Sequence, residues 1–257
     1  MDIKYLKIIF NRIRYGYVYN NYLEKKRNKK ILEENRLQKT AKIKEPLVSV
    51  LIPTYNRREL LTERSLPSVL RQTYQNLEII IIGDHCTDDT CEKMDDFNDK
   101  RIKFYNLPER GEYPDDLDYR WMVGGAIPAN VAIEISSGEW IAPLDDDDEF
   151  SDDHVETLLK FALENEYELV YGKVEREIEP NHWEELGSYP LQNGEISHMS
   201  VLYSSKLKFI KYNTESWKYG EPSDWNEWRR MGEAGAKIGF IDKIVGKHYL
   251  ERQQMIN

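Results

Sequence analysis

Short apolar runs alternate along the chain with stretches whose apolar positions repeat at helical spacing. Five of the runs have the length of buried strands, at residues 47–52, 77–82, 101–105, 140–144 and 169–174. Helical spacing predicts helices between them, at residues 59–71, 87–97, 119–135 and 152–165. Strands that alternate with helices through short turns are typical of a mostly parallel, doubly wound sheet flanked by helices. We therefore predict a Rossmann-like α/β fold.

Two of the predicted helices carry interruptions. Pro67 falls inside the first helix, which should kink or begin late, because proline cannot donate the helical hydrogen bond. Gly124 and Gly125 weaken the first half of the helix at residues 119–135. A long loop, at residues 106–118, separates that helix from the strand before it.

Polar residues gather at the ends of three predicted strands, at residues 53–57, 83–85 and 145–148. The carboxyl ends of parallel strands meet at one edge of a sheet, and ligands bind outside that edge. Asp84 follows its strand directly, where a carboxylate can accept from a base N–H or a ribose hydroxyl; taken alone, it is more often a turn residue. The pattern therefore predicts a binding site along this edge.

Four consecutive carboxylates, Asp145, Asp146, Asp147 and Asp148, follow the strand at residues 140–144. Their mutual repulsion needs compensation, and the usual compensation at a strand end is a hard divalent cation, Mn²⁺ or Mg²⁺. Magnesium takes one or two carboxylates and shares the rest of its shell with substrate phosphates, which favours a diphosphate-bearing substrate. The alternative is a solvated acidic loop that caps the next helix.

Three further residues are candidates for contacts with an acceptor or a metal. His198 lies in a strand-like segment and His248 lies near the end of the chain, although a structural role is the commoner one for such histidines. Trp225 lies beside Asp224, in the aromatic and charged segment at residues 221–230. An aromatic ring beside a carboxylate suits a sugar pocket, and a core-facing amphipathic helix is the alternative.

Several segments, in order along the chain, resemble glycosyltransferase family 2. They are VSVLIPTYNR at residues 48–57, SVLRQTY at 68–74, the strand and turn at 77–90, the segments within 129–148 that lead into a DxD motif, and SDWNEWRRM at 223–231. Five modest motifs in the right order are together highly specific. The resemblance covers about residues 46–245 and implies that residues 46–257 form a GT-A domain.

The resemblance also implies a function and roles for site residues. The family transfers a sugar, with inversion, from a nucleotide-diphospho-sugar (UDP-sugar favoured) to a glycan or lipid-linked acceptor, which suggests polysaccharide biosynthesis. The nucleotide-sugar would be held by Pro53, Tyr55, Arg57, Asp84, Asp145 and Asp146. Asp84 would contact the base and Arg57 the diphosphate. Asp145 and Asp147 form the DxD pair, with Asp147 the direct ligand of Mn²⁺ or Mg²⁺, and Asp224 matches the general base.

The chain departs from the family pattern at two positions. Gly83 replaces the first of two acids that often mark the nucleotide turn, and Ser223 replaces the acid that commonly precedes the base. The QxxRW-type motif and the membrane helices of processive members are missing from the sequence, which favours transfer of a single sugar.

The N-terminal 45 residues form a basic extension. They hold 13 Lys/Arg and 5 Asp/Glu, a net charge of +8, whereas residues 46–257 hold 23 and 41, a net charge of −18. Helical spacing predicts an amphipathic helix whose apolar stripe consists of Leu6, Ile9, Phe10 and Ile13. Such a helix can place residues 1–30 on an anionic membrane, or it can pack on its own domain or on a second subunit, as in a homodimer.

Composition excludes several classes of protein. The acidic body repels phosphates, so we predict no nucleic-acid partner. Cys86 and Cys91 lack zinc-type spacing and are predicted to be free thiols. No run approaches the roughly 20 apolar residues of a membrane helix, and none has the form of a secretory signal. We therefore expect a cytoplasmic protein, peripheral on the inner face of the membrane if its first helix binds lipid.

Two other classes of function stay open. A nucleotidyltransferase or another metal-dependent enzyme on a similar sheet would need a glycine-rich phosphate loop after the first strand, and residues 53–58 contain no glycine. A catalytically inactive binding module would not need the DxD pair or Asp224, and both are present.

Overall fold

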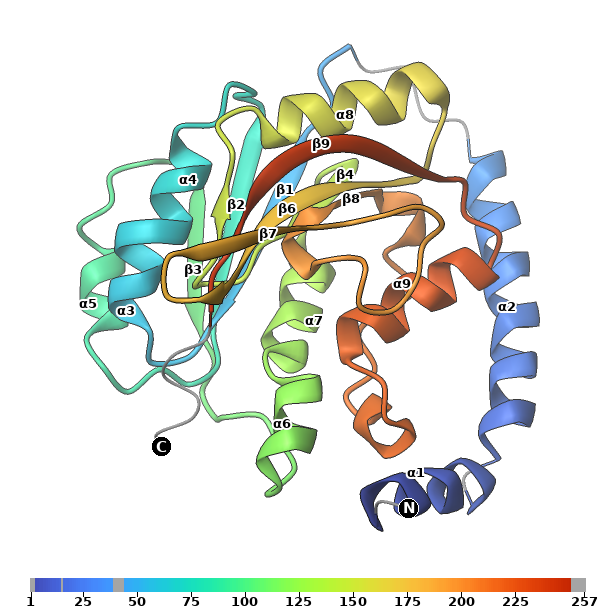
Figure 1. Ribbon diagram of the computed structural model, residues 1–257. Helices are drawn as coiled ribbons and strands as arrows, with labels where there is room; N and C mark the ends of the chain where they lie inside the picture. Colours follow the sequence, from blue (N-terminus) through green and yellow to red (C-terminus); the bar gives the residue numbers. More distant parts are fainter. Residues whose placement is uncertain (1–2, 15, 39–43, 251–257) are drawn as a thin grey trace.

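The computed structural model describes residues 3–14, 16–38 and 44–250. The parts of the predicted extension and body that lie outside the described residues are 1–2, 15, 39–43 and 251–257. The described strands are β1 (Val48–Thr54), β2 (Leu77–Gly83), β3 (Ile102–Asn106), β4 (Trp140–Pro143), β5 (Glu149–Phe150), β6 (Leu169–Glu179), β7 (His182–Leu186), β8 (Val201–Ser204) and β9 (Ile238–His248). These described strands form one sheet in the order β3-β2-β1-β4-β8-β6-β9-β5, and β7 pairs with β6 (Figure 1).

The half of the sheet that carries β3, β2, β1 and β4 is parallel, as the sequence pattern predicts. β1 and β2 are buried along their whole length, which explains why their sequences are continuous apolar runs rather than alternating ones. Their register pairs Val48 with Leu77 and Thr54 with Gly83, so both strands end at the same level. The predicted α/β class is confirmed.

The other half of the sheet is mixed, and apolar runs predict it less well. β8 is antiparallel to β4 and to β6, whereas β9 is parallel to β6 and antiparallel to β5. The strand predicted at residues 169–174 is longer and continues to Glu179, where it turns into β7. The strand-like segment around His198 begins with a 3₁₀ turn, η2 (His198–Ser200), and only then becomes β8.

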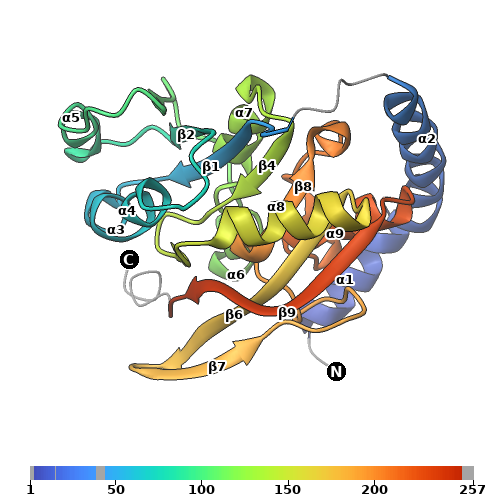
Figure 2. The same cartoon turned by 90° about the horizontal axis from the view of Figure 1, so that it is seen from above.

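Helices cover both faces of the sheet (Figure 2). One face packs against η1 (Leu61–Ser65), α4 (Leu66–Leu70) and α8 (His154–Asn165). The short helix α3 (Arg58–Leu60) leads into η1. The other packs against α6 (Leu117–Val123), α7 (Ala126–Ile135) and α9 (Ser223–Glu233). Successive side chains of a strand point to opposite faces, so Val50 and Ile52 enter the first core and Leu51 enters the second.

The predicted helices differ from the observed ones where proline, glycine and caps intervene. Pro67 lies in the first turn of α4, after the π-helical turn η1, so residues 58–70 stay helical without a break. The helix predicted at residues 119–135 is two helices, because Gly125 adopts a left-handed conformation (φ 75°) between α6 and α7. The helix predicted at residues 87–97 is limited to α5 (Thr90–Met94).

The N-terminal extension contains α1 (Ile3–Arg14) and α2 (Tyr17–Leu37). α2 packs on the body, since Leu32 is fully buried in the second core and Arg36 donates to both carboxylate oxygens of Glu168, at 2.7 and 2.5 Å. A second tie joins Arg230 of α9 to Glu24, at 2.6 Å. No helix in the described residues is both long enough and apolar enough to span a bilayer.

Candidate active site

A cleft of about 770 Å³ opens where β1, β2 and β4 end. Its lining includes the turn at residues 53–57, Asp84 behind β2, and Asp145, Asp146 and Asp147 behind β4. The three polar turns meet here because the carboxyl ends of parallel strands share one edge. Residues of α6, α7 and α9 line much of the rest of the cleft, together with His198 of the turn η2 and with His248 at the end of β9. Its volume suits a small-molecule or cofactor ligand.

Asp84 lies in a corner of the cleft that is closed by the loop after β3. Its side chain is almost fully buried and accepts from the Gly111 backbone N–H at 3.1 Å and from the Tyr113 hydroxyl at 2.7 Å. Burial, followed by this bond to Asp84, raises the pKa of Tyr113. The Arg110 guanidinium lies 3.5 Å from the centre of the Tyr55 ring. The corner therefore presents a stacked cation and an aromatic ring beside a carboxylate.

Sequence patterns alone do not single out Arg110 or Tyr113, which belong to no motif. The available signal is the length of the predicted loop at residues 106–118, because long loops in a compact domain usually carry function. Arg110 and Tyr113 reach the corner because this loop folds back onto Asp84 in the structure.

Arg57, at the end of the turn after β1, bridges two carboxylates of the acidic run. Its Nη1 atom lies 2.9 Å from Asp146 Oδ1 and 2.8 Å from Asp147 Oδ2. Burial raises the pKa of Asp146 to about 7 and also raises the pKa of Asp147, although Arg57 opposes both shifts. Arg57 therefore neutralises part of the negative charge of the four adjacent carboxylates.

His248 supplies a second counter-charge, to Asp148. Its Nδ1 atom lies 2.8 Å from Asp148 Oδ2, and the Tyr249 backbone N–H donates to Asp148 Oδ1 at 3.0 Å. Burial alone would lower the pKa of His248, but Asp148 and its acidic neighbours raise it to about 9. Arg64 joins the same arrangement by donating to the Asp147 backbone carbonyl at 2.6 Å and by stacking on the Tyr249 ring. Asp148 is thus held by the end of β9.

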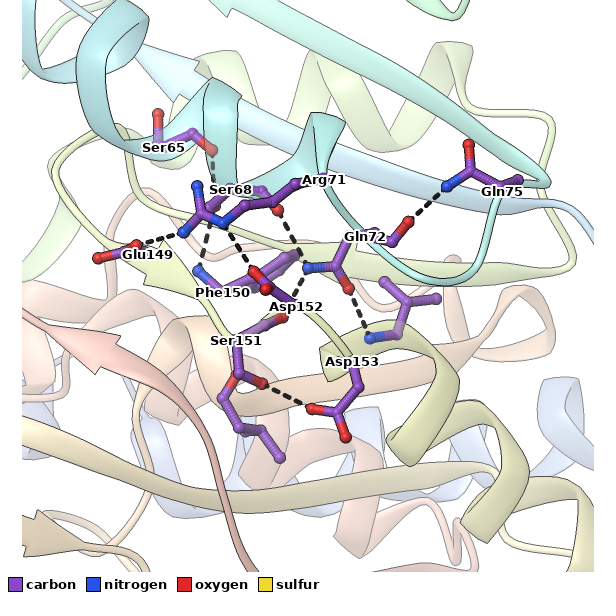
Figure 3. A network of polar contacts seen from close by, with 12 residues as sticks. Ser65, Ser68, Arg71, Gln72, Gln75, Glu149, Phe150, Ser151, Asp152 and Asp153 are labelled. Atoms are coloured by element: carbon purple, nitrogen blue, oxygen red, sulfur yellow. Dashed lines mark hydrogen bonds and ion pairs between the residues drawn. The ribbon is translucent and has the colours of Figure 1, made fainter.

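The segment that follows the acidic run is fixed by a polar network (Figure 3). The network joins Ser68, Arg71 and Gln72, at the end of α4, to Glu149, Phe150, Ser151 and Asp152. Gln72 uses both ends of its amide, donating to the Ser151 carbonyl at 2.6 Å and accepting from the Val155 N–H at 3.0 Å. Because these contacts start one residue after Asp148, they limit the movement of the acidic run.

His198 connects the acidic run to the wall built by α9. Its Nδ1 atom lies 3.0 Å from Asp145 Oδ1, and its Nε2 atom lies 2.7 Å from the Tyr212 hydroxyl. Burial alone would lower the pKa of His198, but Asp145 raises it to about 9, and His198 in turn holds the pKa of Asp145 low against burial. Asp224, at the start of α9, also lines the cleft; burial raises its pKa, and His198 opposes that shift.

The aromatic residues of α9 divide between cleft and core. Trp225 is partly buried and lines the cleft, whereas Trp228 is fully buried in the second core. Glu227, one turn after Asp224, is fully buried, and within the described residues neither of its carboxylate oxygens makes a well-formed hydrogen bond. Burial raises the pKa of Glu227 to about 8. The pattern of this helix does not predict so unusual a carboxyl group.

The family model described as Glycosyl transferase family 2 matches residues 49–114 and 117–230, which is well over half of the chain. The chain belongs to this family. The match includes the acidic run, Asp84 and Asp224, and therefore most of the lining of the cleft.

Curated relatives within the family match about half of the chain. One, from Escherichia coli, is named UDP-Glc:alpha-D-GlcNAc-diphosphoundecaprenol beta-1,3-glucosyltransferase WfgD; it is 33% identical over 129 residues, 50% of this chain and 46% of the relative. Another, from Campylobacter jejuni, is named GalNAc(5)-diNAcBac-PP-undecaprenol beta-1,3-glucosyltransferase; it is 32% identical over 160 residues, 61% of this chain and 48% of the relative. The matched regions thus span about half the length of these relatives.

Solved structures share the fold. S. aureus TarS in complex with UDP-GlcNAc has a TM-score of 0.65 and 19% identity, over 82% of this chain and 61% of TarS. The mannosyltransferase PcManGT from Pyrobaculum calidifontis, in complex with GDP-Man and Mn²⁺, has a TM-score of 0.60 and 16% identity, over 97% of this chain and 69% of that protein. These similarities confirm the GT-A fold that the family 2 motifs imply.

The donor set of this family 2 cleft fits a metal that completes its shell with substrate. No group of three or more His, Cys, Asp or Glu side chains in the described residues is arranged to hold an ion. Asp145 and Asp147, however, both line the cleft with oxygen donors, and a hard cation needs only one or two carboxylates when phosphates supply the rest. The residues present are therefore compatible with Mn²⁺ or Mg²⁺ bound together with a diphosphate.

Proposed function

We propose that this protein transfers one sugar, with inversion and with the help of a divalent metal, from a nucleotide-diphospho-sugar to an acceptor hydroxyl. The observation that carries the proposal is a single cleft that brings the DxD residues Asp145 and Asp147 together with Asp224. Family membership supports the class of reaction, and the physical character of each residue supports its role.

The nucleotide of the donor would lie along the ends of β1 and β2. Asp84 would contact the base, and Pro53 and Tyr55 would form the platform beside it, with Arg110 stacked on the Tyr55 ring. UDP is the favoured carrier, because the structural relative TarS binds UDP-GlcNAc. Arg57 would face the diphosphate. There its guanidinium could exchange its ion pairs with Asp146 and Asp147 for ion pairs with the phosphate oxygens.

Asp147, with Asp145, would hold the metal, which when bound would neutralise charge on the leaving nucleoside diphosphate. Asp224 would take the proton from the acceptor hydroxyl as that oxygen attacks the sugar from the side opposite the diphosphate, which inverts the anomeric centre. Burial raises the pKa of Asp224, and a carboxylate with a raised pKa is a stronger base. His198 would position Asp145 through their ion pair.

The acceptor is proposed to be a lipid-linked saccharide. Two curated relatives carry names that specify undecaprenol-diphosphate acceptors. The rim of the cleft also has exposed apolar side chains, Leu117 and Trp121 of α6, which suit the neighbourhood of a lipid. A place in polysaccharide biosynthesis and a cytoplasmic location remain predictions that follow from this acceptor and from the sequence.

The test is a panel of nucleotide-sugars with Mn²⁺ or Mg²⁺ and an undecaprenyl-diphosphate-linked GlcNAc acceptor, followed by release of nucleoside diphosphate. One donor should give metal-dependent release, and Asp147→Ala should abolish it. Asp224→Asn should lower kcat by about 10²- to 10⁴-fold and leave donor affinity unchanged. Asp95→Asn, at an exposed carboxylate beyond the end of α5, is the matched control and should retain full activity.

Two results would contradict the proposal. Full activity of Asp224→Asn would remove Asp224 as the base. If no donor of the panel released nucleoside diphosphate, and calorimetry detected no nucleotide binding, the protein would be an inactive binding module.

A further inference from the structure

The apolar stripe of α1 is exposed rather than packed on the body. Its four residues have exposed fractions of 45% for Leu6, 38% for Ile9, 60% for Phe10 and 75% for Ile13. An amphipathic helix that served only to pack on its own domain would turn this stripe inward.

α1 docks on the body through other residues. Arg12 donates twice to the Tyr219 backbone carbonyl, at 3.0 and 2.8 Å, and the Lys7 ammonium lies 5.3 Å from the centre of the Tyr119 ring. The side chain of Ile8 lies close against Gly220. These contacts fix the helix with its apolar stripe facing away from the protein.

The exposed surface continues into α2. Eight of the sixteen exposed large apolar side chains in the described residues lie between residues 6 and 23. The second group of four consists of Val18, Tyr19, Tyr22 and Leu23. Such a concentration in one short segment marks an interaction surface, since scattered exposure is the ordinary case. We call the eight residues the N-terminal apolar surface.

We propose that the N-terminal apolar surface docks on an anionic membrane and holds the cleft open toward the lipid, an inference that rests on the proposed lipid-linked acceptor. The charge distribution selects this occupant. The extension carries +8 and the body −18, so an anionic surface attracts the extension and repels the body. Exposed apolar helices with basic and aromatic residues lie at the boundary of headgroups and acyl chains.

A second copy of the chain fits this surface less well. A symmetric contact between two N-terminal apolar surfaces would bring two basic extensions together, and their like charges would repel. Contact with the acidic body of another copy would need a matching apolar patch there. Apart from Leu117 and Trp121, which share α6 and line the cleft, the exposed apolar residues of the described body, such as Tyr105, Ile135 and Leu163, lie on separate elements.

The docked orientation brings the rim of the cleft to the membrane. The 3₁₀ turn η4 (Ser216–Tyr219) packs against both α1 and α6, and the Trp217 ring lies 5.1 Å from the Tyr119 ring of α6. α1 and the first turn of α6 lie at the same end of the molecule (Figure 1). α6 carries Leu117 and Trp121, which are 58% and 57% exposed and line the cleft. An acceptor could keep its lipid in the bilayer while its saccharide enters the cleft.

Vesicle sedimentation of the full chain tests the proposal. Vesicles of equimolar phosphatidylcholine and phosphatidylglycerol should bind the protein, vesicles of phosphatidylcholine alone should bind it much less, and added salt should weaken the binding. The double variant Phe10→Gln and Ile13→Gln should partition roughly 10- to 100-fold less, because the apolar area it can bury is smaller. Leu163→Gln, at an exposed leucine on α8, is the matched control and should bind like the parent protein.

Activity separates this proposal from the proposed function. The double variant should transfer sugar normally to a water-soluble, short-chain acceptor and should lose activity toward the same saccharide embedded in anionic vesicles. Loss of both activities in the parent protein would instead overturn the proposed function. Equal vesicle binding by parent and double variant would overturn the membrane proposal. A dimer that the double variant converts to a monomer, with lipid binding unchanged, would also overturn it and assign the surface to a second copy.

Discussion

Replacing Glu227 with glutamine should have little effect below pH 4.5 and should stabilise the protein increasingly as the pH rises from there to about 8. Glu227 is fully buried, and within the described residues neither of its carboxylate oxygens makes a well-formed hydrogen bond. Burial raises its pKa to about 8, although Arg230 and His198 oppose the shift. The native protein therefore holds this carboxyl group in its neutral form at pH 6, and glutamine is a neutral side chain of nearly the same shape.

The sign and size of the effect follow from proton linkage. Between the ordinary pKa of 4.5 and the raised value of about 8, the folded state binds a proton that the unfolded state has released. The stabilisation is complete below pH 4.5 and is lost as the pH rises through 8. At about 1.4 kcal/mol per pH unit, the loss between pH 6 and pH 8 is about 2 kcal/mol. In a domain of this size that corresponds to roughly 4–8 °C in Tm.

Thermal unfolding of parent and Glu227→Gln proteins across pH 6 to 9 measures the effect. Groups other than Glu227 titrate in both proteins, so the difference in Tm between them isolates this residue. The variant should gain on the parent protein as the pH rises, whereas Glu164→Gln, at an exposed carboxylate on α8, should follow the parent throughout. A difference that stays constant between pH 6 and pH 8 would show that Glu227 is not held neutral, and the reasoning from burial would fail.

Two further predictions concern other parts of the molecule. A Cβ atom at Gly138 would lie 2.5 Å from Ser49 Oγ and 2.8 Å from the Leu47 carbonyl, so Gly138→Ala should cost about 1–3 kcal/mol and lower the urea midpoint without changing the m-value. An unchanged midpoint would mean that β1 can move aside. Asp84→Asn should weaken nucleotide binding about 10- to 100-fold in calorimetry, because a charged acceptor is lost, and should also lower Tm, because the amide keeps only one of the two buried acceptor oxygens. An unchanged affinity for the nucleotide would mean that the nucleobase does not contact Asp84.

The sequence predicts the parallel half of the sheet because strands that are buried on both faces have nearly continuous apolar sequences. β1 and β2 lie between two helical layers, so every position is apolar or otherwise tolerates burial, and short turns join each strand to the next helix. The sequence of β9 is not a continuous apolar run. Asp242 and Lys243 interrupt its middle, and its register against β6 shifts twice. Its pairing is decided by contacts some 70 residues apart in the chain, which a local pattern does not contain.

The site divides in the same way. The turns at residues 53–57 and 83–85 and the acidic run can be found from sequence, because each directly follows a predicted strand and topology alone brings strand ends together. The partners of these residues cannot be found in this way. His248 lies 100 residues from Asp148, and Arg57 lies about 90 residues from the carboxylates that it bridges. Such pairs depend on how loops close over the sheet edge.

The four consecutive acids of the run, which are alike in the sequence, have different surroundings in the structure. Asp148 is fully buried and its two oxygens are engaged by His248 and by the Tyr249 N–H, so it serves to anchor β9. Asp145 faces His198, and Asp146 and Asp147 share Arg57. Asp145 and Asp147 therefore each pair with a basic side chain that also lines the cleft. If a metal and a diphosphate bind there as proposed, Arg57 can exchange its carboxylates for phosphate oxygens without leaving any of these charges buried and unpaired.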